Sequence, residues 1–97
     1  LEKNPNNLLA HRYLGEFYLQ VSAGDVSKLQ TGISHFEHIL KVNPNDVTAT
    51  LSLVEAYMAL PNQGKATYHL ERLEDLVGED QFFKEFIETK QKEIKSL

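Results

Sequence analysis

The sequence NPNNLLAHRYLGEFYLQV at residues 4–21 returns in altered form as NPNDVTATLSLVEAYMAL at residues 43–60. The two copies share an Asn-Pro step, apolar residues at helical spacing and a tyrosine at the same offset, Tyr18 in one and Tyr57 in the other. Apolar residues that recur every three or four positions are typical of a helix with one buried face. A unit that repeats in this way predicts an all-α array of stacked helical hairpins.

The expected helix ends fall at residues that favour turns. The Asn-Pro step at residues 43–44 separates the two copies, because the residue before a proline disfavours helical geometry. A Gly-Asp step at residues 24–25 and the sequence PNQG at residues 61–64 divide each copy into two helices. Gly78 suits the end of the fourth helix, and a fifth helix is expected to begin near Asp80.

Asparagine and aspartate residues stand where helices need caps. Asn6 or Asn7 is expected to accept a hydrogen bond from the free N–H groups of a helix that begins near Leu8. Asp46 is expected to do the same for a helix that begins near Val47. These two helices would be the first members of the two hairpins.

Each expected helix has apolar residues at steps of three and four, which predicts one buried face per helix. The expected buried residues, in chain order, are Ala10, Leu14, Phe17, Tyr18, Val21, Leu29, Gly32, Ile33, Phe36, Ile39, Leu40, Ala49, Leu53, Ala56, Tyr57, Leu60, Ala66, Leu70, Leu73, Leu76, Phe83, Phe86, Ile87 and Ile94. Phe82 is also expected to be core rather than a docking patch. The last stretch becomes increasingly polar, which suits a helix that covers the end of an array.

Composition excludes several classes of function. At 97 residues the chain is one domain, and no apolar run approaches the roughly 18 to 20 residues of a membrane span. The chain has no cysteine, so disulfides, zinc fingers and thiol nucleophiles are excluded. The net charge is -4, and residues 71–80 contain five acidic residues and one arginine, which disfavours a nucleic-acid partner.

The histidines do not predict a catalytic or metal site. His35 and His38 stand three residues apart, but a structural metal site needs about four ligands, and Glu37 points about 100° away from either. We expect both to lie on a solvated convex face, His69 on the outer side of its helix, and His11 to pack at a repeat junction. Without a nucleophile motif or phosphate loop, we expect no enzyme activity, cofactor or metal.

The repeated pattern resembles the tetratricopeptide repeat, whose consensus is W-x2-L-G-x2-Y, then A-x3-F, then P, with a period of roughly 34 residues. The match extends over about residues 1–80. Matching residues are Leu14, Gly15, Tyr18, Phe36 and Pro44 in the first copy, with Gly32 at the small position, and Leu53, Tyr57 and Ala66 in the second. The second copy has Val54, Leu70 and Gly78 as replacements, and His11 and Thr50 stand where the consensus has Trp.

The resemblance implies a right-handed α-α superhelix of two helix hairpins plus a C-terminal capping helix. It assigns repeat 1 to about residues 6–44, repeat 2 to about 45–79 and the capping helix to about 80–97, all within a single domain over 1–97. A start such as Leu1-Glu2-Lys3-Asn4 reads as the last turn of a preceding helix. We therefore expect the chain to be the C-terminal part of a longer repeat protein.

Two further expectations concern the first hairpin. Gly15 and Gly32 would let its helices approach closely, with Phe36 filling the volume around them. The first repeat is 39 residues long and the second 34, so five residues are added, two before the first turn and three after it. The hairpin tip at residues 22–27 should therefore protrude.

In the resembled family, the first helices of successive hairpins line a concave groove that accepts an extended peptide or a partner helix. The corresponding residues here are Leu9, Arg12, Glu16, Leu19, Gln20, Thr48, Leu51, Glu55 and Met58. Their charges favour an apolar or basic peptide, so we expect a protein-protein interaction module that binds a protein or peptide. The alternatives are a structural segment that stacks on its parent or forms a homo-oligomer through the exposed first helix, and an accessory domain of a larger enzyme or assembly factor.

Overall fold

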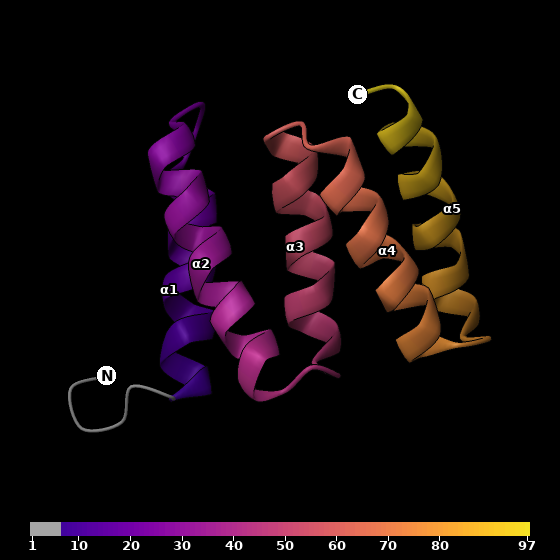
Figure 1. Ribbon diagram of the computed structural model, residues 1–97. Helices are drawn as coiled ribbons and strands as arrows, with labels where there is room; N and C mark the ends of the chain where they lie inside the picture. The colour runs from indigo at the N-terminus through magenta and orange to yellow at the C-terminus, as the bar shows by residue number, and fades with distance from the viewer. Residues whose placement is uncertain (1–6) are drawn as a thin grey trace.

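Five helices make up most of the chain. The computed structural model describes residues 7–97, and no strand occurs among them. The helices are α1 (Leu8–Val21), α2 (Val26–Val42), α3 (Val47–Ala59), α4 (Gln63–Val77) and α5 (Gln81–Lys95) (Figure 1). The predicted all-α fold class is confirmed, while the expectation for residues 1–4 lies outside the described part.

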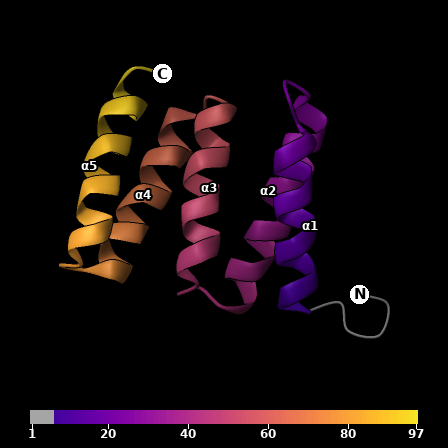
Figure 2. The ribbon, with the colours of Figure 1, turned by 180° about the vertical axis from the view of Figure 1, so that it is seen from behind.

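The helices form a row that is two layers thick. In chain order, α1 packs on α2, α2 on α3, α3 on α4 and α4 on α5. The molecule measures 40 × 30 × 19 Å, and a helix with its side chains is about 10 to 12 Å wide. One layer contains α2 and α4, which face the viewer in Figure 1, and the other contains α1, α3 and α5, which face the viewer in Figure 2.

Every one of these helices begins after an Asn or Asp whose side chain accepts a hydrogen bond from the first turn. Asn7 Oδ1 accepts from the Ala10 N–H at 3.1 Å, and Asp46 Oδ1 accepts from the Ala49 N–H at 2.9 Å. Both predicted caps are therefore confirmed, and the remaining caps are Asp25, Asn62 and Asp80. Gly78 follows α4 with a φ of 60°, a conformation that favours glycine.

Two glycines bring α1 and α2 close together. A Cβ atom on Gly15 would lie 2.7 Å from Phe36 Cε2, and one on Gly32 would lie 3.1 Å from the Gly15 carbonyl oxygen. Both distances are shorter than the roughly 3.5 to 4.0 Å that carbon contacts prefer. Because Phe36 is fully buried in this space, a larger residue at Gly15 would force it to move.

The core lies between the two layers, and the predicted core of α1 is partly wrong. The predicted core residues of α2 to α5, apart from Phe82, are buried or half-buried. In α1, however, Phe17 is 47% and Val21 37% exposed, while His11 and Gly15 are buried. The reason is that α2 covers one side of α1, and no other helix of the described chain covers the side of Phe17.

The prediction that Phe82 belongs to the core is also wrong, because its side chain is 77% exposed. Successive residues on a helix point about 100° apart, so Phe82 and Phe83 cannot face the same way. The Phe83 side chain packs against the core, and the Phe82 ring meets it edge-on at a centroid distance of 5.2 Å.

The first hairpin is longer than the second. Its helices α1 and α2 have 14 and 17 residues, compared with 13 and 15 in α3 and α4. The turn between α1 and α2 closes with a hydrogen bond from the Asp25 N–H to the Ser22 carbonyl oxygen, and Gly24 adopts a φ of 89°. Both helices are thus lengthened around this turn.

Candidate functional site

The α1–α3–α5 layer holds most of the residues that were expected to line a groove. Two ion pairs bridge neighbouring helices of this layer. Arg12 Nη2 lies 2.6 Å from Asp46 Oδ2, and Lys90 Nζ lies 3.8 Å from Glu55 Oε2. Two of the expected groove residues, Arg12 and Glu55, therefore bind other parts of the chain.

The Arg12–Asp46 pair is the better shielded of the two, with side chains 26% and 11% exposed. Burial opposes the ionisation of Asp46, but the hydrogen bond and charge of Arg12, together with the Ala49 N–H, outweigh it and lower the pKa of Asp46. The pair ties α1 to the start of α3.

The other expected groove residues are divided between the core, the layer surface and the outer side of α1. Leu19 packs over Gly32, since a Cβ atom there would lie 3.0 Å from Leu19 Cδ2. Leu51 and Met58 are half-buried against the core. Glu16, Gln20 and Thr48 are exposed. The surface of the α1–α3–α5 layer at these positions is therefore mainly polar, with a few half-buried apolar side chains.

The outer side of α1 exposes an apolar row of side chains, Leu9, Tyr13, Phe17 and Val21, which we call the α1 stripe. Leu9 is 76% and Tyr13 69% exposed. Residues four apart on a helix lie on the same face, so the row is continuous along α1. A shallow hollow lined by Asn7, Leu9, Ala10, Tyr13 and Leu14 begins the row.

Only part of the same side of α3 is covered. The positions equivalent to Leu9 and Tyr13, 39 residues further on, are Thr48, which is exposed, and Ser52, which is half-buried. The position equivalent to Phe17 is Ala56, which is buried in a helix that packs against both α4 and α2. The apolar row is therefore particular to α1, and its end at Phe17 corresponds to a buried position of α3.

Three histidines meet between α1 and α2. His11 Nδ1 lies 2.9 Å from His35 Nδ1, and the rings of His11 and His38 have centroids 4.1 Å apart. Burial and the charges of His11 and His38 lower the pKa of His35. His11 is buried, as expected of a packed histidine, and it contacts α2 of its own hairpin. The prediction of a solvated face for His35 and His38 is wrong, because both contact His11. Within residues 7–97, no three His, Asp or Glu side chains are arranged to hold a metal ion.

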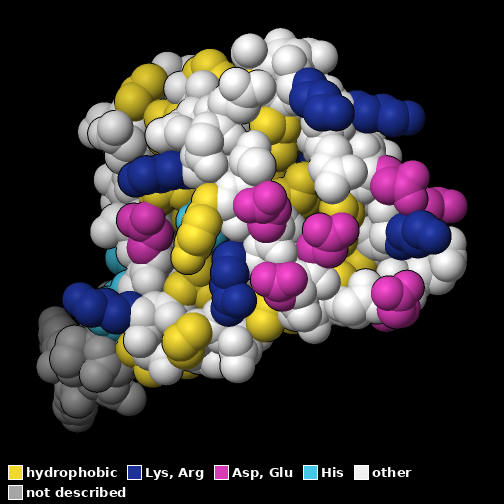
Figure 3. Space-filling model, turned by 45° about the vertical axis from the view of Figure 1, so that its right-hand side comes forward, with side chains coloured by type: hydrophobic (Ala, Val, Ile, Leu, Met, Phe, Trp, Pro, Cys, Tyr) yellow, Lys and Arg dark blue, Asp and Glu magenta, His cyan; other side chains and the backbone are white. Residues whose placement is uncertain are grey.

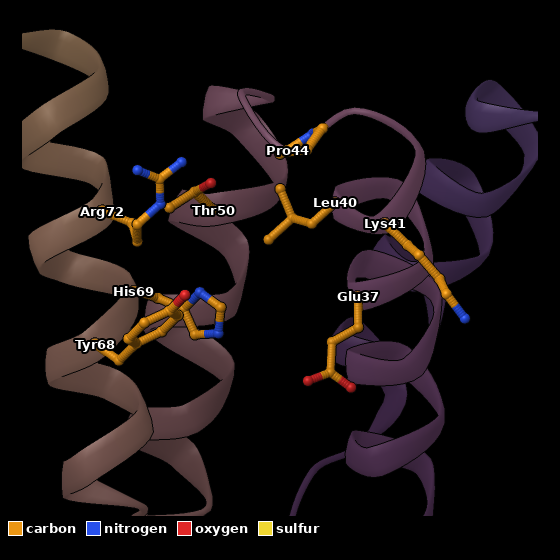
Figure 4. A pocket seen from close by; sticks show the side chains of 8 residues that line it. All are labelled: Glu37, Leu40, Lys41, Pro44, Thr50, Tyr68, His69 and Arg72. Atoms are coloured by element: carbon orange, nitrogen blue, oxygen red, sulfur yellow. The ribbon is translucent and has the colours of Figure 1, made fainter.

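A pocket of about 550 Å³ opens in the other layer, between α2 and α4 (Figure 4). We call it the α2–α4 pocket, and its lining residues are Glu37, Leu40 and Lys41 of α2, Pro44 of the connection, Thr50 of α3, and Tyr68, His69 and Arg72 of α4. None of these residues was expected to line a groove. The sequence analysis therefore missed this mixed polar and apolar concavity.

A hydrogen-bonded tyrosine lies beside this pocket. The Tyr57 hydroxyl donates to Glu37 Oε2 at 2.6 Å, and the His69 ring lies parallel to the Tyr57 ring with centroids 5.5 Å apart. Burial, with the hydrogen bond and charge of Glu37, raises the pKa of Tyr57. Burial lowers the pKa of His69, Glu37 opposes this change, and Lys65 and Arg72 add to it. His69 is buried, so its predicted place on the outer side of α4 is wrong.

Acidic side chains gather on the side of the molecule formed by α4 and α5 (Figure 3). Glu71 and Glu74 line a hollow between α4 and α5, and Glu74, Glu79 and Glu88 line a second one. Glu71 and Glu74 belong to α4, Glu79 to the connection that follows it, and Glu88 to α5.

Comparison with known proteins adds no identification. No model of a known protein family and no curated protein matches this chain. Across residues 7–97, each helix is too short or too polar to cross a membrane.

Proposed function

We propose that the chain is a protein-protein interaction module of the tetratricopeptide type, in which two hairpins and a capping helix form part of a right-handed superhelix. The observation that carries this proposal is the α1 stripe. Contiguous apolar side chains on a protein surface commonly mark a site for another protein. The partner would be a helix or helical hairpin that lays its apolar face along α1.

The packing of α3 supports this choice of partner. Helix α3 buries the positions equivalent to Ala10, Leu14 and Phe17, and it packs against the preceding helix, α2, as well as against α4. A partner helix on α1 would repeat the same kind of contact, with Leu9 and Tyr13 adding apolar area. Burying apolar surface contributes roughly 25 cal/mol per Å², so covering this row would supply most of the binding free energy.

Selection of binding peptides from a displayed library tests the proposal. We expect the selected peptides to have apolar residues at steps of three and four, and to lose at least tenfold in affinity when Tyr13→Glu is introduced. The matched control is Phe82→Glu, which places the same charge at an equally exposed apolar position on α5. If the selected peptides bind the Tyr13→Glu variant as well as the unchanged chain, the α1 stripe is not the binding surface.

The second candidate site is the α1–α3–α5 layer, where Leu51 and Met58 are half-buried and Glu16 and Glu55 are exposed. An extended peptide with apolar and basic residues would match this surface. In that case the selected peptides would be insensitive to Tyr13→Glu and weakened by Glu16→Lys. Self-association through the α1 stripe is a third outcome, which light scattering would reveal as a dimer that Tyr13→Glu dissociates.

A further inference from the structure

The α2–α4 pocket lies in the opposite layer from the expected groove and takes no part in the α1 stripe. We propose that it binds an acidic segment of a protein partner, with a carboxylate on the Arg72 guanidinium and a neighbouring apolar side chain against Leu40 and Pro44. Its volume of about 550 Å³ falls within the roughly 300 to 1,000 Å³ of typical ligand sites. The proposal is independent of the function proposed for α1.

The two cations at this pocket are available to a ligand. Neither Arg72 nor Lys41 forms an ion pair with any described residue. In Figure 4, the Arg72 guanidinium lies beside Thr50 at the edge of the cavity, whereas the Lys41 side chain extends outward from the opposite rim. A guanidinium binds a carboxylate through two parallel N–H donors, which makes Arg72 the stronger anchor.

The single carboxylate of the pocket is already engaged. Glu37 accepts the hydrogen bond from Tyr57 at 2.6 Å, which partly satisfies its charge. Lys41 and Arg72 together outweigh this one acid, and the low pKa of His69 keeps that ring neutral near pH 7. The pocket is therefore a positive concavity in a chain whose net charge is -4.

The apolar part of the pocket argues for a peptide rather than a free ion. Leu40 and Pro44 form one wall, and the half-exposed ring of Tyr68 stands on the other side (Figure 4). A small anion would use only the charged end of the pocket. An extended segment with alternating acidic and apolar side chains would use both ends, because alternate side chains of an extended chain point the same way.

Nuclear magnetic resonance titration with an unlabelled peptide of alternating aspartate and leucine, whose two termini are blocked, tests the proposal. We expect shifts of the amides of Thr50, Tyr68 and Arg72, and little change on α1. Arg72→Gln should weaken binding about tenfold, since a hydrogen bond to a charged group contributes roughly 1.5 to 3 kcal/mol. The control is Lys28→Gln, which removes the same charge from an exposed site on α2 outside the pocket and should change affinity less than twofold.

A gain of affinity separates this effect from a folding defect. Glu37→Gln removes the only like charge of the pocket but keeps an oxygen for the Tyr57 hydroxyl, so it should tighten the peptide severalfold. Two control peptides replace the aspartates by asparagine or by lysine, and the proposal is overturned if either one binds as well as the aspartate-leucine peptide. It is also overturned if acetylated glutamate alone binds as tightly as that peptide, or if the peptide shifts no amide of the pocket. It is also overturned if Arg72→Gln and Lys28→Gln have the same effect.

Discussion

The two hairpins solve the same packing problem with different pairs of side chains. In the first, Gly15 of α1 faces Phe36 of α2, and in the second the matching residues are Val54 and Leu70. A small residue against a large one is thus replaced by two of intermediate size. The comparison teaches that matching buried positions of two hairpins can be filled by different pairs of side chains, because a close-packed interior depends on how neighbouring side chains fit together.

The hairpins also differ in how they satisfy their buried polar groups. Tyr18 and Tyr57 occupy the same position in their repeats, but only the Tyr57 hydroxyl has a hydrogen-bond partner among the described residues, Glu37. The Tyr18 ring stacks on His35 at a centroid distance of 6.1 Å. The second hairpin is therefore joined to α2 of the first by a charge-assisted hydrogen bond.

The largest effect is expected from closing the space at Gly15. Gly15→Ala should lower the free energy of unfolding by about 1 to 3 kcal/mol through overpacking, because its Cβ would lie 2.7 Å from Phe36 Cε2. Urea denaturation measures this loss. The control Gly64→Ala adds the same atom where the nearest neighbour is 3.8 Å away, and should stabilise the chain by up to about 1 kcal/mol.

Copying the second hairpin into the first should restore the contact. The Phe36→Leu change frees the volume that a side chain at position 15 needs, so Gly15→Val with Phe36→Leu should be more stable than Gly15→Val alone. A double variant no more stable than Gly15→Val would refute the idea that the pair of the second hairpin can replace the pair of the first.

The next effect concerns the tyrosines. Tyr57→Phe should lower the free energy of unfolding by about 1 kcal/mol, since it removes a hydrogen bond to a partly solvated carboxylate. Tyr18→Phe, the matched change in the first hairpin, should cost less than about half as much. The pKa of Tyr57 is raised, so Tyr57 should be the last of the four tyrosines to ionise in an absorbance titration. This last step of the titration should be absent from the Tyr57→Phe variant.

A smaller effect is expected at the cap of α3. Asp46→Asn keeps a capping oxygen but loses the charge that Arg12 binds, so it should cost about 0.5 to 1 kcal/mol. Asp25→Asn changes the exposed cap of α2, which forms no ion pair with any described residue, and should cost almost nothing. Thermal unfolding of the two variants compares them, and equal costs would show that the ion pair does not contribute.

The smallest effect is the response to acid. The pKa of His35 and of His69 is lowered in the folded chain, so the unfolded chain binds more protons and stability falls as the pH drops below about 6.5. We expect a lower Tm at pH 5 than at pH 7.5. His35→Asn should reduce this dependence through the first hairpin, and His69→Asn through the second; a dependence unchanged in both variants would exclude these histidines as the cause.

Local features of the fold were predictable from the sequence. The caps Asn7 and Asp46 and the end at Gly78 depend on residues within one turn of each other, so their spacing identifies them. The close approach at Gly15 and Gly32 was also predictable, because both glycines stand at small-residue positions of the repeat pattern that the sequence resembles.

The candidate sites were harder to predict because they depend on which helices are neighbours. Phe17 has the spacing of a core residue, yet its side chain is exposed because no described helix covers that side of α1. The periodicity of the sequence does not indicate which sides of a helix are covered. Tyr57 and Glu37 lie 20 residues apart on different helices. The one available signal was that a buried tyrosine hydroxyl needs a partner, which directs attention to acidic residues on the facing helix.

The two carboxylate oxygens of Asp46 bind different partners. Oδ1 accepts from the Ala49 N–H and begins α3, while Oδ2 binds Arg12 of α1. Nucleation of the second hairpin is therefore tied to the presence of the first. In a stacked array whose units contact only their neighbours, such a link raises the coupling free energy between units. Amide hydrogen exchange in the first turn of α3 should then occur only when α1 also opens, so the two hairpins lose their protection together.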